Sequence, residues 1–234
     1  MNNSNFKVIL SVGNRCYTEI YLKGLGLKKF SSPFGSVYLK NVDNIIHLFK
    51  NKINYNNMIH TQDLTDKCII NLNNKHGFRS IYKDFMDPVI ENGEHLYHGA
   101  TFAHHNLKDD SNKKHFDRCF QRIDIIKKHN IKTLFCMFLF PFYGSKYSPH
   151  VNVSTEDIYK LRDYLIHKFN CKLLVINFSN KPYKIIENTE SLMHVNVYSQ
   201  STNFQINKEI LQHIFKENNV SPEYLLSYQQ IHDL

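Results

Sequence analysis

Two almost wholly apolar segments constrain the fold of this chain more than any other feature. The first is Thr133 to Phe140, TLFCMFLF, and the second is Leu173 to Phe178, LLVINF. A strand that is apolar at every position is buried on both faces, and such strands lie at the centre of a sheet that helices cover. Residues 154–169 between them have helical spacing, so this part of the chain predicts a βαβ unit with a right-handed crossover.

The rest of the chain continues the order of strand and then helix. We expect further strands at residues 6–12, 68–72, 97–106 and 192–198, and further helices at 16–23, 42–50, 116–129 and 206–215. Asn41 and Ser154 are expected to begin helices, and Gly24 is expected to end one. The sequence therefore predicts a single α/β domain over residues 1–234, with a mostly parallel central sheet, helices on both faces and a less regular segment at about 51–95.

Composition narrows the cellular setting. The chain has no apolar run of about 18 residues and no apolar leader, so we expect no membrane span and a cytoplasmic location. Its five cysteines are odd in number and form no CxxC pair, which indicates reduced thiols. Abundant Asn, Lys and Ile indicate an AT-rich genome, such as that of a large DNA virus or a parasite; for a viral protein the location would be the host cytoplasm.

The formal net charge is +8. Such a charge favours an anionic substrate or nucleic acid. The lysines are scattered along the chain, however, and no basic stripe with stacking aromatic residues is visible. We therefore do not expect specific nucleic-acid binding, and keep it only as a second alternative function.

The segment from Val8 to Leu22, VILSVGNRCYTEIYL, carries the first candidate for chemistry. It predicts a strand, a tight glycine turn and a helix that begins at Cys16. The partial positive charge and unpaired N–H groups of a helix N-terminus favour a thiolate, which is the nucleophilic form of cysteine. Backbone N–H groups of Asn14, Arg15 and Tyr17 could hold an oxyanion. The alternative is a small residue buried at a strand–helix corner.

A cysteine nucleophile needs a base, and the base needs an orienting group. His104 and His105 follow a predicted strand, and at most one of two neighbouring residues faces Cys16. Asp109 and Asn177 are the candidates for orienting that histidine. The alternatives are that one histidine is a hydrogen-bonded part of the fold and that Asn177 pairs within the sheet.

Other kinds of site have weaker signals. The histidines between residues 95 and 115 could bind zinc, but no HExxH or CxxC motif is present, and we expect no metal and no cofactor. Arg118 and Arg122 lie one turn apart on the predicted polar face of a helix. They could clamp an anionic group such as that of a glycan or nucleotide-sugar, or they could simply face solvent.

The sequence also resembles a known family. Ser11 to Cys16, SVGNRC, resembles the SLGxxC opening of a domain family of unknown function labelled putative papain-like cysteine peptidases. Residues 22–28, 32–34 and 102–105, and the helix with the two arginines, are similar to later segments of that family, over about residues 6–180. The resemblance implies a Cys–His hydrolase centre in which Cys16 and His104 match the family's residues. Where the family has an acidic residue and a tryptophan, this chain has Gly35-Ser36.

Together these features favour a Cys–His hydrolase or acyltransferase with Cys16 as nucleophile and His104 as base and acid. Its substrate would be a small molecule, a glycan or a peptide with a reactive carbonyl. The first alternative is a non-catalytic module that binds an anionic ligand. The sequence leaves the oligomeric state open.

Overall fold

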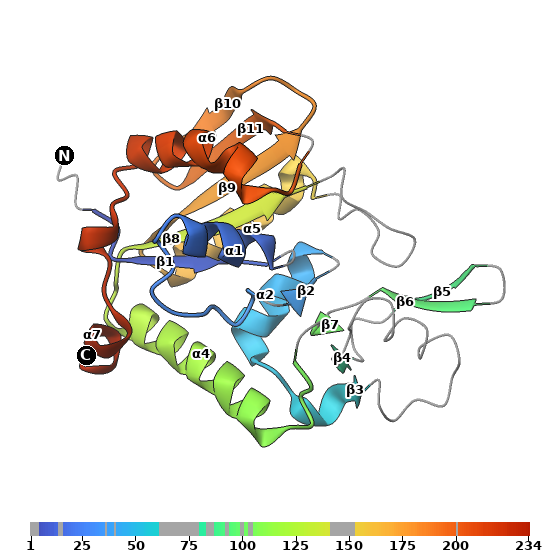
Figure 1. The fold of residues 1–234 in the computed structure, drawn as a ribbon. Helices are drawn as coiled ribbons and strands as arrows, with labels where there is room; N and C mark the ends of the chain where they lie inside the picture. The colour runs from blue at the N-terminus through green and yellow to red at the C-terminus, as the bar shows by residue number, and fades with distance from the viewer. Residues whose placement is uncertain are drawn as a thin grey trace.

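The computed structural model describes residues 5–13, 16–35, 37–39, 41–60, 80–82, 87–91, 94–98, 101–102, 105–140, 153–199 and 201–234. Its centre is a five-stranded sheet with the order β1-β8-β9-β11-β10 (Figure 1). The strands are β1 (Val8–Ser11), β8 (Thr133–Leu139), β9 (Cys171–Ser179), β11 (Leu192–Tyr198) and β10 (Lys184–Asn188). The first four run parallel and β10 is antiparallel to β11, which confirms a mostly parallel sheet.

β8 is buried at all seven positions, as its sequence predicts. Leu134 and Phe138 point into one apolar cluster, whereas Phe135 and Leu139 point into another. This alternation follows from the twofold side-chain period of a strand. The sheet therefore separates two hydrophobic cores, each of which needs its own layer of helices.

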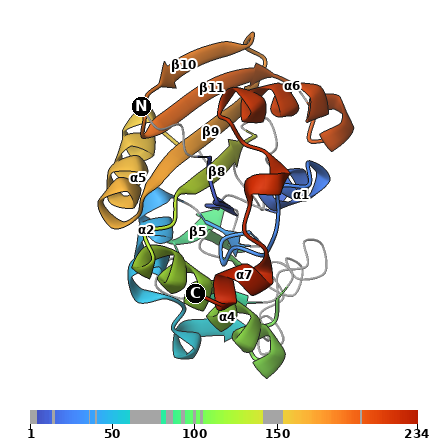
Figure 2. The same cartoon turned by 90° about the vertical axis from the view of Figure 1, so that its left-hand side faces the viewer.

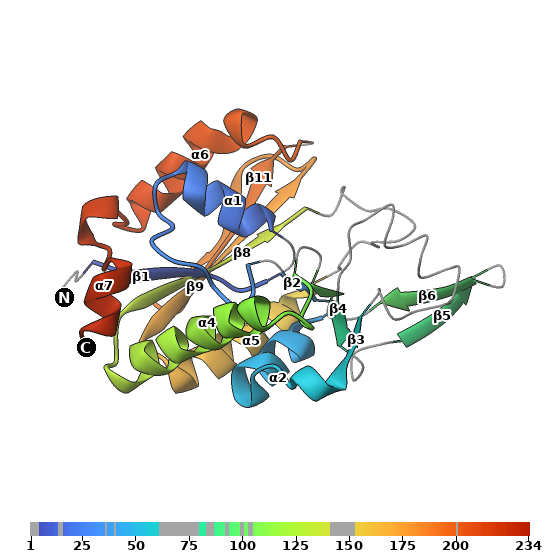
Figure 3. The ribbon, with the colours of Figure 1, turned by 60° about the horizontal axis from the view of Figure 1, so that its bottom comes forward.

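Figures 2 and 3 show these two layers. One layer consists of α1 (Tyr17–Gly24) and α6 (Phe204–Glu217), and the other of α2 (Val42–Asn51), α4 (Asp110–Lys128) and α5 (Thr155–Lys168). A short C-terminal helix, α7 (Tyr228–His232), packs beside α4. The prediction of helices on both faces is confirmed. Each predicted helix is present, but α4 begins at Asp110 rather than at Phe116, so its predicted start is wrong.

Two of the three predicted helix caps are correct. The side chain of Asn41 accepts the N–H of Asn44, and Ser154 forms a reciprocal capping box with Asp157. α1 does end at Gly24, but the residue that caps it is Leu25, so the prediction of Gly24 as the C-cap is wrong. Gly26 has the left-handed angle (φ +72°), and its N–H donates to the carbonyl of Lys23.

Gly24 serves a different purpose, which is close helix packing. A Cβ atom at this position would lie 2.7 Å from the ring of Phe204. The missing side chain therefore allows α1 to approach α6.

A second, antiparallel sheet with the order β2-β7-β4-β3 lies beyond the carboxyl end of β1 (Figures 1 and 3). It consists of β2 (Val37–Tyr38), β7 (Thr101–Phe102), β4 (Ser80–Tyr82) and β3 (Met58–His60), with a separate hairpin of β5 (Asp87–Glu91) and β6 (Glu94–His98). Single turns of 3-10 helix occupy Tyr55–Asn57 and Pro222–Tyr224. The predicted strand at 97–106 is divided between β6 and β7, and the one at 68–72 lies outside the described residues.

In the part of the chain that the structure describes, every helix is too short or too polar to cross a lipid bilayer.

Candidate active site

The predicted nucleophile lies at the junction of the central sheet and α1. β1 ends at Ser11, and Cys16 directly precedes α1 with helical backbone angles (φ −67°, ψ −13°). The carbonyl of Cys16 accepts the N–H of Ile20 at 2.9 Å, so the first turn of the helix starts at the thiol residue. Cys16 is half-buried. Asn14 and Arg15, two of the three predicted oxyanion residues, lie outside the described residues.

Packing holds the flanks of this corner in place. Gly13 adopts φ +95°, and a Cβ atom there would lie 3.2 Å from Leu39 and 3.3 Å from Ile45. Only glycine satisfies both the angle and the space. On the other flank, the ring of Tyr17 packs against Phe140 with centroids 5.2 Å apart. Gly13 and Tyr17, the described residues on either side of this corner, are therefore packed against α2 and against Phe140 at the end of β8.

The other described thiols have environments that suppress reactivity. Cys119 and Cys136 are fully buried. Burial raises the pKa of the Cys119 thiol to about 11 and that of Cys171 to about 12, and it also raises the pKa of Cys136. A thiol with a raised pKa has little thiolate at neutral pH. These three residues therefore serve as internal references for the reactivity of Cys16.

One predicted histidine is held by a residue that the sequence did not suggest. His105 Nδ1 lies 3.1 Å from the side-chain oxygen of Asn112. An amide oxygen only accepts, so this contact assigns the proton to Nδ1 and leaves Nε2 as the basic nitrogen. The amide nitrogen of Asn112 donates to the carbonyl of Asn106 at 3.0 Å and to Asp109 at 3.3 Å. Asp109 therefore acts on His105 only through Asn112, and His104 lies outside the described residues.

Aromatic rings hold the other side of His105. Its ring stacks on His115 (5.5 Å, 11° between planes) and meets the ring of Phe116 edge-on at 5.1 Å. His115 Nε2 in turn lies 3.8 Å from the sulfur of Cys119. Burial lowers the pKa of His115, and the neighbouring His105 lowers it further. The neutral form of His115 is therefore favoured, and its ring packs between a thiol and a second histidine.

The two arginines do not form the expected pair. Arg118 is exposed, whereas Arg122 is 4% exposed and faces the core rather than the polar face. Arg122 Nη2 donates to the carbonyl of Ser31 at 3.1 Å, and its guanidinium lies between the rings of Phe30 and Tyr228. Among the described residues its Nε has no partner. The prediction of a solvent-facing clamp for an anionic ligand is therefore wrong for Arg122.

A buried carboxylate that the sequence analysis did not single out lies one turn from Cys16. Glu19 Oε1 accepts the N–H of Ser32 at 2.8 Å, and Oε2 lies 2.5 Å from the ammonium of Lys28. The hydroxyl of Ser11 is 3.5 Å away. A Cβ atom on Gly35 would lie 1.9 Å from the Glu19 carboxyl carbon. Glu19 thus joins the first turn of α1 to the end of β1 and to the 28–35 loop.

Asn177 pairs within the sheet, as expected for an amide in an apolar strand. Its side-chain nitrogen donates to the amide oxygen of Asn196 on β11 at 3.2 Å. Both residues line a cavity of ≈ 450 Å³ at the carboxyl half of β9, beside the start of α5.

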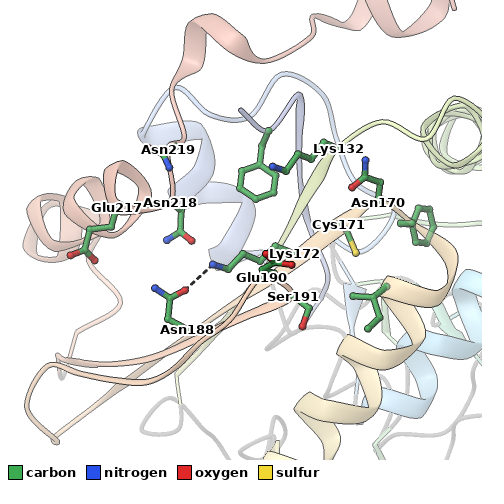
Figure 4. A pocket seen from close by; sticks show the side chains of 13 residues that line it. Lys132, Asn170, Cys171, Lys172, Asn188, Glu190, Ser191, Glu217, Asn218 and Asn219 are labelled. Carbon is green, nitrogen blue, oxygen red and sulfur yellow. Dashed lines mark hydrogen bonds between the residues drawn. The ribbon is translucent and has the colours of Figure 1, made fainter. Parts of the chain in front are cut away.

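A second cavity, of ≈ 690 Å³, opens at the edge of the sheet formed by the amino ends of β9 and β11, whereas the first cavity lies toward their carboxyl ends (Figure 4). Lys132 and Lys172 line it, and Lys172 donates to the amide oxygen of Asn188 at 2.8 Å. Burial lowers the pKa of Lys172, and Lys132 adds to this effect. α5 and α6 both end at this edge, and helix carboxyl ends favour cations. The two lysines therefore have a structural explanation, far from the Cys16 corner.

A metal site was considered because of the many histidines. Over the described residues, no three His, Cys, Asp or Glu side chains are placed to hold an ion. His104 and the side chains of His95 and His98 lie outside this comparison.

Comparison with known families gives a match that covers the part of the chain that contains the Cys16 corner. Residues 7–140, more than half of the chain, match the model of a family described as "Putative papain-like cysteine peptidase". The chain belongs to this family. The matched segment runs from β1 through the Cys16 corner and α4 to the end of β8. No curated protein and no solved structure matches the chain.

Gly35 stands at the position where the family resemblance predicts an acidic residue. The structure places the Glu19 carboxylate in the space that a side chain at residue 35 would occupy. A carboxylate is therefore present at this point, supplied by α1 instead of the loop.

Proposed function

We propose that the protein is a cysteine hydrolase or acyltransferase in which Cys16 attacks the carbonyl of a peptide, amide or ester. The observation that carries the proposal is the placement of Cys16: a half-buried thiol at the start of α1, just beyond the carboxyl end of a parallel strand. Active sites of parallel α/β sheets lie at that edge.

The proposed reaction has two stages. The Cys16 thiolate bonds to the carbonyl carbon, and the oxyanion that forms is held by backbone N–H groups at Asn14, Arg15 and Tyr17. The histidine gives its proton to the leaving group, so the carbonyl is left as a thioester on Cys16. The neutral histidine then takes a proton from water, or from another acceptor in an acyltransferase, as that group attacks the thioester and releases the thiol.

We assign the proton transfers to His104 and an anchoring role to His105. His105 has Asn112 on one side and the rings of His115 and Phe116 on the other. A side chain that is held in this way fixes the backbone next to it, and so fixes the position of its neighbour. The opposite assignment, with His105 Nε2 as the base and Asn112 as its orienting group, follows the Cys-His-Asn order of papain-like enzymes.

A generic acyl donor tests the proposal without knowledge of the natural substrate. The full-length protein is mixed with p-nitrophenyl acetate, and the acetylated residue is mapped by mass spectrometry. We expect an initial burst with the acetyl group on Cys16, and no burst from Cys16→Ala. Cys171→Ala is the matched control and should keep the burst. Acetylation of lysines alone, or a burst that survives Cys16→Ala, would contradict the proposal.

The same assay separates the two histidines. His104→Ala should abolish the burst, whereas His105→Ala should slow it by disturbing the backbone. If only His105→Ala abolishes the burst, the base is His105.

A further inference from the structure

The cavity of ≈ 450 Å³ beside α5 carries an inference that does not depend on Cys16. Its volume falls within the usual range of small-molecule sites. It lies at the carboxyl half of β9 and β11 and at the first residues of α5, so three separate elements shape it. This is the edge of a parallel sheet where ligands bind.

Two nearly buried polar side chains line this cavity with hydrogen-bonding groups to spare. His194 and Asn196 are each 8% exposed. Asn196 uses its oxygen to accept from Asn177, and no described residue accepts from its amide nitrogen. The ring of His194 likewise has no hydrogen-bond partner within the described parts of the chain, although it lies in a strand where its neighbours are apolar. Among the described residues, the one buried side-chain atom without a partner is Arg122 Nε, so the free atoms of His194 and Asn196 are open to the cavity, where a ligand can reach them.

The charges around the cavity favour a negative ligand. Among the described lining residues, Lys181 is the one ionised side chain, and no carboxylate is present. Glu187 lies nearby on β10, but it accepts from Tyr159 at 2.9 Å and faces Arg162 at 3.8 Å. The start of α5 adds little positive charge, because the Ser154–Asp157 capping box already closes it and Glu156 and Asp157 lie in its first turn. The ammonium of Lys181, the amide donor of Asn196 and an imidazole N–H of His194 together suit a carboxylate or phosphate oxygen.

The opposite wall is aliphatic. Leu139, Ile158 and Ile186 line it, and the first two are almost completely buried. A ligand that fills the cavity therefore needs an apolar part beside its polar group.

We propose that this cavity binds a small amphipathic anion, with its carboxylate or phosphate group on Asn196, His194 and Lys181 and its apolar part on Leu139 and Ile158. The contacts of the anionic group come from β11 and the connection after β9, and the two β11 residues lie on the side of the sheet that α5 covers. The site is thus separate from the Cys16 corner, which α1 flanks.

Binding is tested by NMR on the full-length chain, with the ring signal of His194 assigned by through-bond experiments on labelled protein. The probes are inorganic phosphate and 4-methylpentanoate, a branched carboxylate. We expect the His194 signal to shift saturably with at least one probe, and the tighter probe identifies the anionic group. Lys181→Met should weaken binding by about tenfold or more, as expected when one charged contact is lost.

Two variants serve as controls. Lys184→Met removes the same charge from a nearby exposed position that does not line the cavity, and should leave binding unchanged. Cys16→Ala should also bind normally, so a failure of the proposed catalysis does not affect this test. The inference is overturned if neither probe shifts His194 up to its solubility limit, or if Lys181→Met and Lys184→Met weaken binding equally.

Discussion

The carboxylate of Glu19 occupies the space that Gly35 leaves by having no side chain. A Cβ atom at residue 35 would lie 1.9 Å from the carboxyl carbon and 2.0 Å from Oε1 of Glu19. The same carboxylate accepts the N–H of Ser32 and pairs with Lys28. The loop before β2 and the first turn of α1 are thus fitted to each other, and the first turn of α1 is where Cys16 lies.

Gly35→Ala should therefore destabilise the protein by about 1–3 kcal/mol, because the added methyl group overlaps a buried side chain. In a Glu19→Ala background the same change should cost much less, since the overlapping atoms are gone. Urea unfolding of the four proteins in this double-mutant cycle measures the coupling.

Gly26→Ala is the matched control. Gly26 has a positive φ angle but open space around its Cβ position. Its substitution should cost about 1 kcal/mol from backbone strain alone and should not depend on residue 19. Equal costs of Gly35→Ala in both backgrounds would show that the two residues are not coupled.

Asn112→Asp should strengthen the hydrogen bond that His105 donates from Nδ1. The substitution replaces a neutral acceptor with a carboxylate, and charge-assisted hydrogen bonds are shorter and stronger than neutral ones. The Nδ1 proton of His105 should therefore exchange with water more slowly and resonate further downfield, which NMR of the labelled protein measures directly.

Asn106→Asp is the control for this change, because the side chain of Asn106 contacts the backbone of Lys108 and the carboxylate of Asp109 rather than His105. It should move the Nδ1 proton signal of His105 much less. If both variants move that signal equally, the His105–Asn112 hydrogen bond is not the cause.

Stability should fall on mild acidification, in part because of His115. Burial lowers its pKa below the ordinary value of 6.5, so the folded protein prefers the neutral ring. At a pH between the folded-state pKa of His115 and 6.5, the unfolded chain binds more protons than the folded protein. The stability that the neutral ring contributes is therefore complete above pH 6.5 and is lost as the pH falls through this window. His194 is shifted in the same direction, also by burial.

His115→Gln should therefore reduce the loss of unfolding free energy between about pH 7.5 and about pH 5.5. His167→Gln, at an exposed position on α5, is the control and should keep the wild-type slope. The explanation fails if His115→Gln and the wild type lose stability in parallel.

The sequence predicted the central sheet because β8 and the middle of β9 carry apolar residues on both faces. Such strands are buried on both sides, which places them at the centre of a sheet that helices cover. It also predicted most helices, since their apolar spacing and N-caps are local signals. β10 was missed because most of its residues are exposed, so it has no buried face to reveal it.

The site was harder to predict because its contacts join distant segments. The Glu19–Gly35 fit and the His105–Asn112 hydrogen bond depend on how loops meet helices, and no local pattern encodes them. The burial of Arg122 did have a signal. It follows Cys119 by three residues and precedes Ile126 by four, so it shares their buried face.

Alkylation of the native protein tests the central claim, that Cys16 is an activated thiol, most directly. Iodoacetamide is added near neutral pH, and the labelled cysteines are mapped over time, with the urea-unfolded chain as the reference for intrinsic reactivity. We predict that Cys16 is labelled first, and that its rate follows a thiolate with a pKa below the ordinary value of about 8.5. Labelling of Cys16 no faster than that of Cys68 or Cys171 would contradict the account.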